Sequence, residues 1–170
     1  ISSFKTPALY FKALIVATVL TACLSGCASV STMDQAAAVE AINGNPPEGQ
    51  ARIYVYRDDV LGAALYKDIY IDGKCLGESA PNTFFYADVE GDKDHFVSTE
   101  SEFSPNHLFI YTKANEKYYI QQFLKMGVFV GGAALTQVDK DAALRAMQEC
   151  ELAVPGTCSS AQEVKLPNKQ

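Results

Sequence analysis

His95 and His107, together with nearby serines, are the residues whose chemistry could support hydrolysis. A serine hydrolase needs a serine nucleophile, a histidine that accepts its proton and an acid that orients the histidine. Ser98, Ser101 and Ser104 lie between the two histidines, which are the only ones in the chain. The spacing matches no triad, and no nucleophile-elbow pattern is present. We therefore predict no catalytic residue and expect both histidines to be polar strand-end residues in water.

Acidic residues gather in three short segments that could hold a metal ion: Asp58-Asp59, residues 88–90 and residues 92–94. None of them has the ligand spacing and terminal glutamate of a calcium loop. Cys75 has no neighbouring cysteine or histidine at zinc-site spacing. We predict solvated turns at these positions, with no metal and no cofactor.

Residues 127–132 form a glycine-rich apolar segment that invites comparison with a phosphate-binding loop. The Lys-Ser or Lys-Thr pair that such a loop requires after its glycines is missing. Val128, Phe129 and Val130 interrupt the glycines and favour a core strand, a bulge or a close backbone approach. In the alternative, these three side chains are exposed and contact a partner protein or a membrane leaflet.

The first residues have the order of a secretory signal. Lys5 and Lys12 flank a polar start, residues 13–24 form an apolar run, and the small pair Ser25-Gly26 precedes Cys27. A helix that crosses a bilayer needs about 20 apolar residues, which is longer than this run. Secretion is therefore favoured over a permanent transmembrane helix.

The motif Leu24-Ser25-Gly26-Cys27 resembles the lipobox of bacterial lipoproteins. That resemblance implies removal of residues 1–26 as a signal peptide and acylation of Cys27, with a diacylglycerol on its thiol and an acyl chain on its amine. Several acyl chains anchor a protein firmly to a membrane. Ala28, rather than an aspartate, follows Cys27, which in that family implies the outer membrane, with the domain facing the periplasm.

Three of the five cysteines, Cys75, Cys150 and Cys158, would lie in an oxidising compartment where a disulfide persists. We favour Cys75 with Cys150, because the longer closed loop gives the larger entropic stabilisation. A bond from Cys150 to Cys158 is the alternative pairing. Three unpaired thiols are a further possibility, because connectivity does not follow from sequence.

Length and charge indicate one acidic domain. The chain has 170 residues, with 20 Asp and Glu against 14 Lys and Arg, and this balance disfavours nucleic acid as a partner. Membrane attachment would rest on acyl chains rather than on a basic patch. We expect a signal peptide at 1–26, a lipidated N-terminus and flexible tether at 27–50, a β-sandwich at 51–154 and a disordered tail at 155–170. Fully extended, the tether would reach about 70 to 80 Å.

The mature sequence has the period-two alternation of half-buried strands. Asp72-Gly73 is a strong hairpin signal, and Asp139 is placed to cap a C-terminal helix that ends near Glu149. Asp34 could cap a marginal helix through Ile42. The predicted strands are 51–57, 65–71, 74–77, 83–89, 95–99, 107–112 and 117–124. The fold class is mainly β: a small antiparallel β-sandwich with one C-terminal helix.

The segments 69–77, 84–86, 98–103 and 117–120 together resemble a family of bacterial lipoproteins that share a domain of unknown function. The strand order is also similar to that of small sandwich domains named for a Pro-Glu-Gly-Ala motif, although 91–94 lacks the Pro-Gly of those domains. The resemblance implies a lipid-anchored sandwich that serves as a binding or envelope-assembly module.

We expect a non-catalytic module that binds another envelope component, a protein, through sheet edges and tyrosine-bearing loops. At least half of the tyrosines are expected to pack in the core instead. The tyrosines considered are Tyr54, Tyr56, Tyr66, Tyr70, Tyr86, Tyr118 and Tyr119. The alternative is a small-ligand or glycan-binding lipoprotein in which Asp58-Asp59 and exposed tyrosines line a groove.

Overall fold

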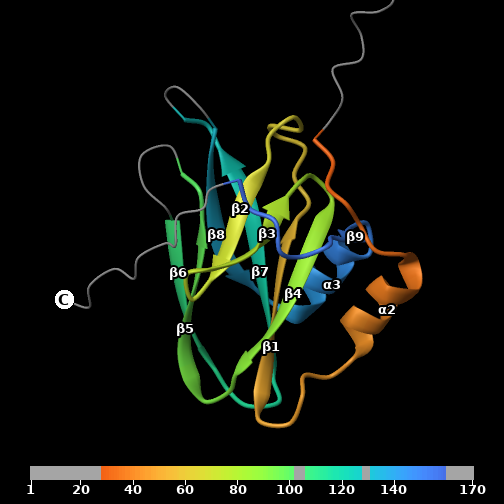
Figure 1. Cartoon of the computed structure of the whole chain (residues 1–170), viewed down its shortest axis with the longest axis vertical. Helices are drawn as coiled ribbons and strands as arrows, with labels where there is room; N and C mark the ends of the chain where they lie inside the picture. The colour runs from red at the N-terminus through yellow and green to blue at the C-terminus, as the bar shows by residue number, and fades with distance from the viewer. Residues whose placement is uncertain (1–27, 102–105, 128–130, 160–170) are drawn as a thin grey trace, which may run out of the picture.

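The computed structural model describes residues 28–101, 106–127 and 131–159, and these residues fold into two packed β-sheets (Figure 1). The larger sheet has the order β8-β7-β1-β4-β9, and the smaller has the order β3-β2-β5-β6. The predicted mainly β sandwich is confirmed. The strands are β1 (Gln50–Arg57), β2 (Lys67–Ile71), β3 (Lys74–Ser79), β4 (Thr83–Glu90), β5 (Lys93–Thr99), β6 (Asn106–Thr112), β7 (Lys117–Lys125), β8 (Gly132–Val138) and β9 (Glu151–Leu152).

The seven predicted strands correspond to β1 to β7, and β8 begins at Gly132, the last residue of the glycine-rich segment. Asp72 and Gly73 both have positive φ, 52° and 79°, in the β2–β3 turn, as the favoured two-residue hairpin turn requires. Most strand pairs are antiparallel, whereas β1 with β7 and β4 with β9 are parallel. Parallel neighbours need a long crossover, and strands β2 to β6 form the connection between β1 and β7.

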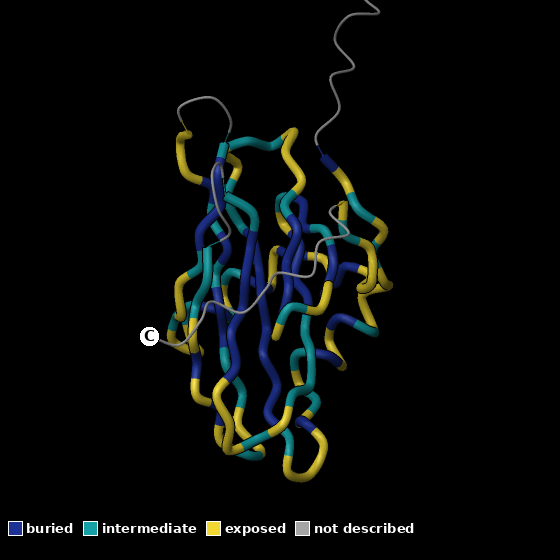
Figure 2. The backbone as a smooth tube through the Cα atoms, turned by 60° about the vertical axis from the view of Figure 1, so that its left-hand side comes forward, coloured by how far each residue is buried: buried dark blue, intermediate teal, exposed yellow. Residues whose placement is uncertain are grey.

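The main core lies between the two sheets. Ile53 and Val55 of β1 face the smaller sheet and pack with Ile69, Val97 and Ile120. Tyr54 and Tyr56 alternate with them and face away, toward the helices. Figure 2 shows the buried strand centres in dark blue and the exposed loops in yellow.

Two helices cover the outer face of the larger sheet. They are α2 (Gln35–Asn43), capped by Asp34, and α3 (Lys140–Met147), capped by the predicted Asp139. Each cap aspartate accepts a backbone N–H three residues later, which satisfies one of the amides that a helix start leaves unpaired. No described helix is long and apolar enough to span a bilayer.

The predicted flexible tether is wrong for residues 28–50, because α2 packs on the sheet. Ala38 and Ala41 are each only 4% exposed, since their small side chains let the helix backbone approach closely. The Tyr54 hydroxyl donates to the Ala41 carbonyl at 2.7 Å, and Lys117 donates to the Ile42 carbonyl at 3.0 Å. These bonds satisfy carbonyls that a helix end leaves unpaired.

The two ends of the described chain run beside each other. Thr32 forms an antiparallel bridge with Ala153, and the Val154 amide donates to the Ser31 carbonyl at 2.8 Å. The chain then crosses the smaller sheet, where Ser159 bonds to Asp68. The predicted disordered tail is therefore wrong for 155–159, and 160–170 lie outside the described residues.

Candidate functional site

The structure brings one serine and one histidine together. The Ser98 hydroxyl lies 2.7 Å from His107 Nδ1, across the β5–β6 pair. Ser98 is fully buried, and the His107 ring lies edge-on to Phe96. Ser101 is not one of the two partners in this contact, and Ser104 lies outside the described residues. This geometry suits a hydrogen bond between neighbouring strands.

His95 is buried, so the prediction that it lies in water is wrong. Its Nδ1 lies 2.6 Å from Asp72 Oδ2, and its Nε2 lies 2.8 Å from the Glu90 carbonyl oxygen. A carboxylate and a carbonyl both accept hydrogen bonds, so each ring nitrogen is used in joining the β2–β3 turn to the end of β4. His95 has the contacts of a structural residue.

The acidic pair Asp58-Asp59 is turned inward rather than toward a groove. Asp58 accepts from the Gln121 amide at 2.8 Å, and Asp59 accepts from Arg57 at 2.9 Å and from the Leu124 amide at 2.6 Å. Within the described ranges, no group of three or more His, Cys, Asp or Glu could hold a metal ion.

The disulfide joins Cys75 to Cys158, so the predicted pairing of Cys75 with Cys150 is wrong. Cys75 lies on β3 of the smaller sheet, whereas Cys150 is buried between the helices and the larger sheet. Packed sheets are about 10 Å apart, which exceeds the Cα separation that a disulfide spans. Ser159, next to Cys158, bonds to the buried Asp68 through both its amide and its hydroxyl. That contact holds the chain end beside β3.

Cys150 is the free, buried cysteine of the described residues. Burial raises the pKa of its thiol from 9.0 to about 12, and burial likewise raises the pKa of Tyr54 in the same cluster from 10.0 to about 12. A thiol nucleophile must ionise, so Cys150 is chemically quiet at neutral pH.

Because the pKa values of the Cys150 thiol and the Tyr54 hydroxyl are raised in the folded protein, we predict that the protein loses stability in alkali. Above about pH 9 the unfolded chain releases protons that the folded chain keeps, so the free energy of unfolding falls by about 1.4 kcal/mol per pH unit for each such group until about pH 12. We expect the urea midpoint to fall from pH 8 to pH 10.5. Between pH 8 and pH 9.5, the urea midpoint of the Cys150→Ala variant should fall less than that of the unmodified protein. An equal fall in the two midpoints would exclude Cys150 as a cause.

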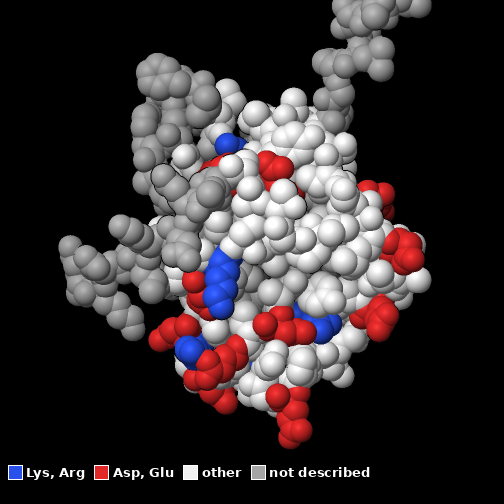
Figure 3. Space-filling view, in the orientation of Figure 1, with Lys and Arg blue, Asp and Glu red and all other residues white. Residues whose placement is uncertain are grey.

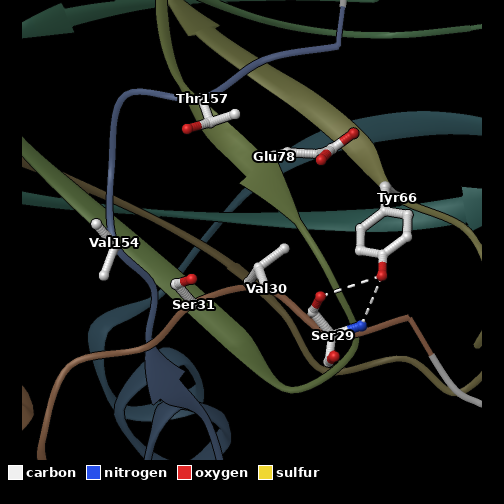
Figure 4. A pocket seen from close by; sticks show the side chains of 7 residues that line it. All are labelled: Ser29, Val30, Ser31, Tyr66, Glu78, Val154 and Thr157. Atoms are coloured by element: carbon white, nitrogen blue, oxygen red, sulfur yellow. Dashed lines mark hydrogen bonds between the residues drawn. The ribbon is translucent and has the colours of Figure 1, made fainter.

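A cavity of about 340 Å³ lies beside the N-terminal segment (Figure 4). The Tyr66 hydroxyl contacts both the amide and the carbonyl of Ser29, at 3.0 and 3.1 Å. Burial, and then the carboxylates of Asp68 and Glu100, raise the pKa of Glu78 in its wall. The other lining residues are Val30, Ser31, Val154 and Thr157.

Arg57 stabilises the loop between β1 and β2 through hydrogen bonds to its backbone. Its side chain is fully buried and donates to the carbonyls of Leu65, at 2.7 Å, and Gly62, at 3.1 Å, besides its ion pair with Asp59. A buried guanidinium is tolerated only when its donors are satisfied, and here backbone carbonyls satisfy them. These hydrogen bonds hold the loop conformation from the interior of the fold.

The outer face of the smaller sheet carries exposed aromatic side chains. Phe109 and Tyr111 of β6 are 62% and 53% exposed, and the Phe109 ring lies 6.2 Å from the Phe96 ring. No described helix covers this face (Figure 1). Among the seven tyrosines considered as contacts, Tyr54, Tyr56, Tyr70 and Tyr119 are buried, which confirms core packing for at least half.

Two of the predicted site elements lie outside the described residues: Cys27 and the segment Val128, Phe129 and Val130. The sequence interpretation also missed the run Val60 to Tyr66, which has no charged residue and follows Asp58-Asp59. That composition was the signal available for an exposed apolar loop.

Comparison with known proteins identifies a family and a relative of similar length. Residues 47–133, from just before β1 into β8, match the family described as "Protein of unknown function (DUF2846)". An "Uncharacterized protein" of Haemophilus influenzae is 42% identical in an alignment 151 residues long, which covers 86% of this chain and 86% of that protein. The chain therefore belongs to the family described as Protein of unknown function (DUF2846).

Proposed function

We propose that this protein is a lipoprotein of the outer membrane, anchored by acyl chains on Cys27 and facing the periplasm, where it acts as a non-catalytic binding or assembly module. The observation that carries the proposal is the motif Leu24-Ser25-Gly26-Cys27 placed directly before Ala28, the first described residue of the domain. A lipoprotein signal would thus be removed at the start of the domain. The Cys75–Cys158 disulfide fits an oxidising compartment.

The proposed partner is a protein of the envelope. The exposed side chains of Phe109 and Tyr111 lie on β6, an edge strand of the smaller sheet. Aromatic side chains supply much of the contact area in protein interfaces, and edge strands present unpaired backbone groups to a partner. Both features favour contact with another protein at this face.

A second candidate is binding of a small ligand or glycan, which the cavity beside Ser29 favours. Its wall combines hydroxyl groups of Ser31, Tyr66 and Thr157 with the Glu78 carboxyl group. A few polar groups in a concave site are the usual basis of small-ligand specificity. Tyr66 already bonds to Ser29 in this cavity, however, so a ligand would compete with that contact.

Photo-crosslinking in intact cells distinguishes the two candidates. A photoreactive amino acid at Phe109 is expected to give one dominant protein adduct. The matched control is the same amino acid at Val39, which is 47% exposed on α2; it should not give that adduct. Identical adducts at both positions, or none at Phe109, would contradict the proposed protein contact at this face.

A further inference from the structure

The N-terminal segment is fastened to the loop between β1 and β2. The Ala28 amide donates to the Ala63 carbonyl at 2.7 Å, and Tyr66 holds Ser29 through two hydrogen bonds. Consecutive Cα atoms are about 3.8 Å apart, so Cys27 is one peptide bond from a residue fixed to this loop. The long reach expected of a tether is therefore lost.

The same end of the molecule exposes apolar side chains. Val60 is 79% exposed and Met126, at the end of β7, is 85% exposed. We define the anchor-side surface as Val60, Leu61, Leu65, Tyr66 and Met126, all of which are exposed. Figure 1 places the β1–β2 loop, the end of β7 and the start of the described chain at one end. Clustered exposed apolar residues mark contact surfaces.

The exposure of these side chains follows from a fixed loop. Arg57 holds the carbonyls of Gly62 and Leu65 from beneath, and Asp59 binds both Arg57 and the Leu124 amide. The carboxylates are thus used inside the fold, whereas the apolar side chains point outward. A loop built in this way presents its apolar residues to whatever lies beyond this end.

A group of charged side chains lies at the end of the molecule opposite the anchor-side surface. Exposed carboxylates gather at the far end of β1, where Lys93 and Lys113 are also exposed. Figure 3 shows a group of acidic side chains at the lower end of the molecule, with further acidic side chains at mid-height and near the upper end. Eight residues of β1 separate the two ends, roughly 25 Å at 3.3 Å per residue. The carboxylates are Glu48, Glu90, Asp92, Asp94 and Glu116.

We propose that the anchor-side surface rests on the lipid leaflet that holds the acyl chains of Cys27, so that the domain has a fixed orientation on the membrane. This inference rests on the proposed acylation of Cys27. The apolar side chains would enter the boundary between headgroups and acyl chains, while Lys125 beside Met126 extends its charge to the headgroups. The acidic end then faces away from the membrane, and the aromatic face of β6 stands at its side, open to a partner.

Tryptophan fluorescence tests the orientation, because the chain contains no tryptophan. The variants Val60→Trp and Lys113→Trp, each expressed from the whole sequence and purified from cell membranes, are reconstituted in phosphatidylethanolamine and phosphatidylglycerol vesicles with bromine on the acyl chains. Bromine quenches nearby indole rings. Val60→Trp should lose emission relative to plain vesicles, because its ring would lie about 5 to 10 Å into the boundary between headgroups and acyl chains, whereas Lys113→Trp, at the acidic end, should keep its emission.

Flotation of the same samples separates the two proposals. Protein that does not float with the vesicles would overturn the lipid anchor. Protein that floats with equal emission from Val60→Trp in brominated and plain vesicles would overturn the orientation, and would mean that the anchor-side surface faces a protein or a second copy. Equal quenching at Val60→Trp and Lys113→Trp would also overturn it.

Discussion

Replacing Cys75 with serine is expected to lower the free energy of unfolding by about 4 to 5 kcal/mol under non-reducing conditions. The bond closes a loop across a sequence separation of 83 residues, so its loss returns a large conformational entropy to the unfolded chain. Small domains are stable by about 5 to 15 kcal/mol in total. The variant should therefore lose a large share of its stability.

Urea unfolding of four proteins tests this bond. Cys75→Ser, Cys158→Ser and the double variant should be destabilised equally, because each removes the same interaction. Cys150→Ala is the control, and it should keep both the disulfide and the response to reducing agent. Additive losses in the double variant, or a disulfide that disappears in Cys150→Ala, would contradict the assignment.

Strands were predictable because the two faces of a strand carry different kinds of side chain, which alternate along the sequence. Ile53 and Val55 alternate with Tyr54 and Tyr56, and the structure places the two sets on opposite faces of β1. The Asp72-Gly73 turn was predictable because its backbone requires positive φ. These features depend on neighbouring residues alone.

The remaining features depend on contacts between distant residues. The helix α2 has little apolar area of its own, and its packing follows from Tyr54 and Lys117, which reach its last carbonyls from β1 and β7. The disulfide partner of Cys75 depends on which cysteine the fold brings near β3. The length of the closed loop does not determine which cysteine that is. The conformation of the Val60 to Tyr66 loop depends on hydrogen bonds from the buried Arg57 side chain. From the sequence alone, an arginine at this position is expected on the surface.

The packing of residues 28–50 changes what an anchor at Cys27 would do. A flexible tether would let the domain search a wide volume for its partner. A domain fastened at Ala28 would instead hold its surfaces at fixed heights above the membrane. The exposed aromatic residues of β6 would then meet partners close to the lipid.

Replacing Cys27 with alanine is expected to abolish incorporation of a labelled fatty acid, because it removes the thiol that we propose as the acceptor of the diacylglycerol. Each buried methylene contributes about 0.8 kcal/mol to membrane attachment, so several acyl chains outweigh the contact of the anchor-side surface. The mature domain without them should leave the membrane fraction. Cys23→Ala is the matched control, because Cys23 lies four residues earlier in the chain and should have no effect on labelling.

The most direct test is the mass of the N-terminal peptide from protein extracted from membranes. We predict a peptide that begins at Cys27 and carries the mass of a diacylglyceryl group and an amide-linked acyl chain. Alkaline hydrolysis should remove the ester-linked chains and leave the amide-linked one. A peptide that continues upstream through Gly26, or one with an unmodified Cys27, would contradict the lipid anchor.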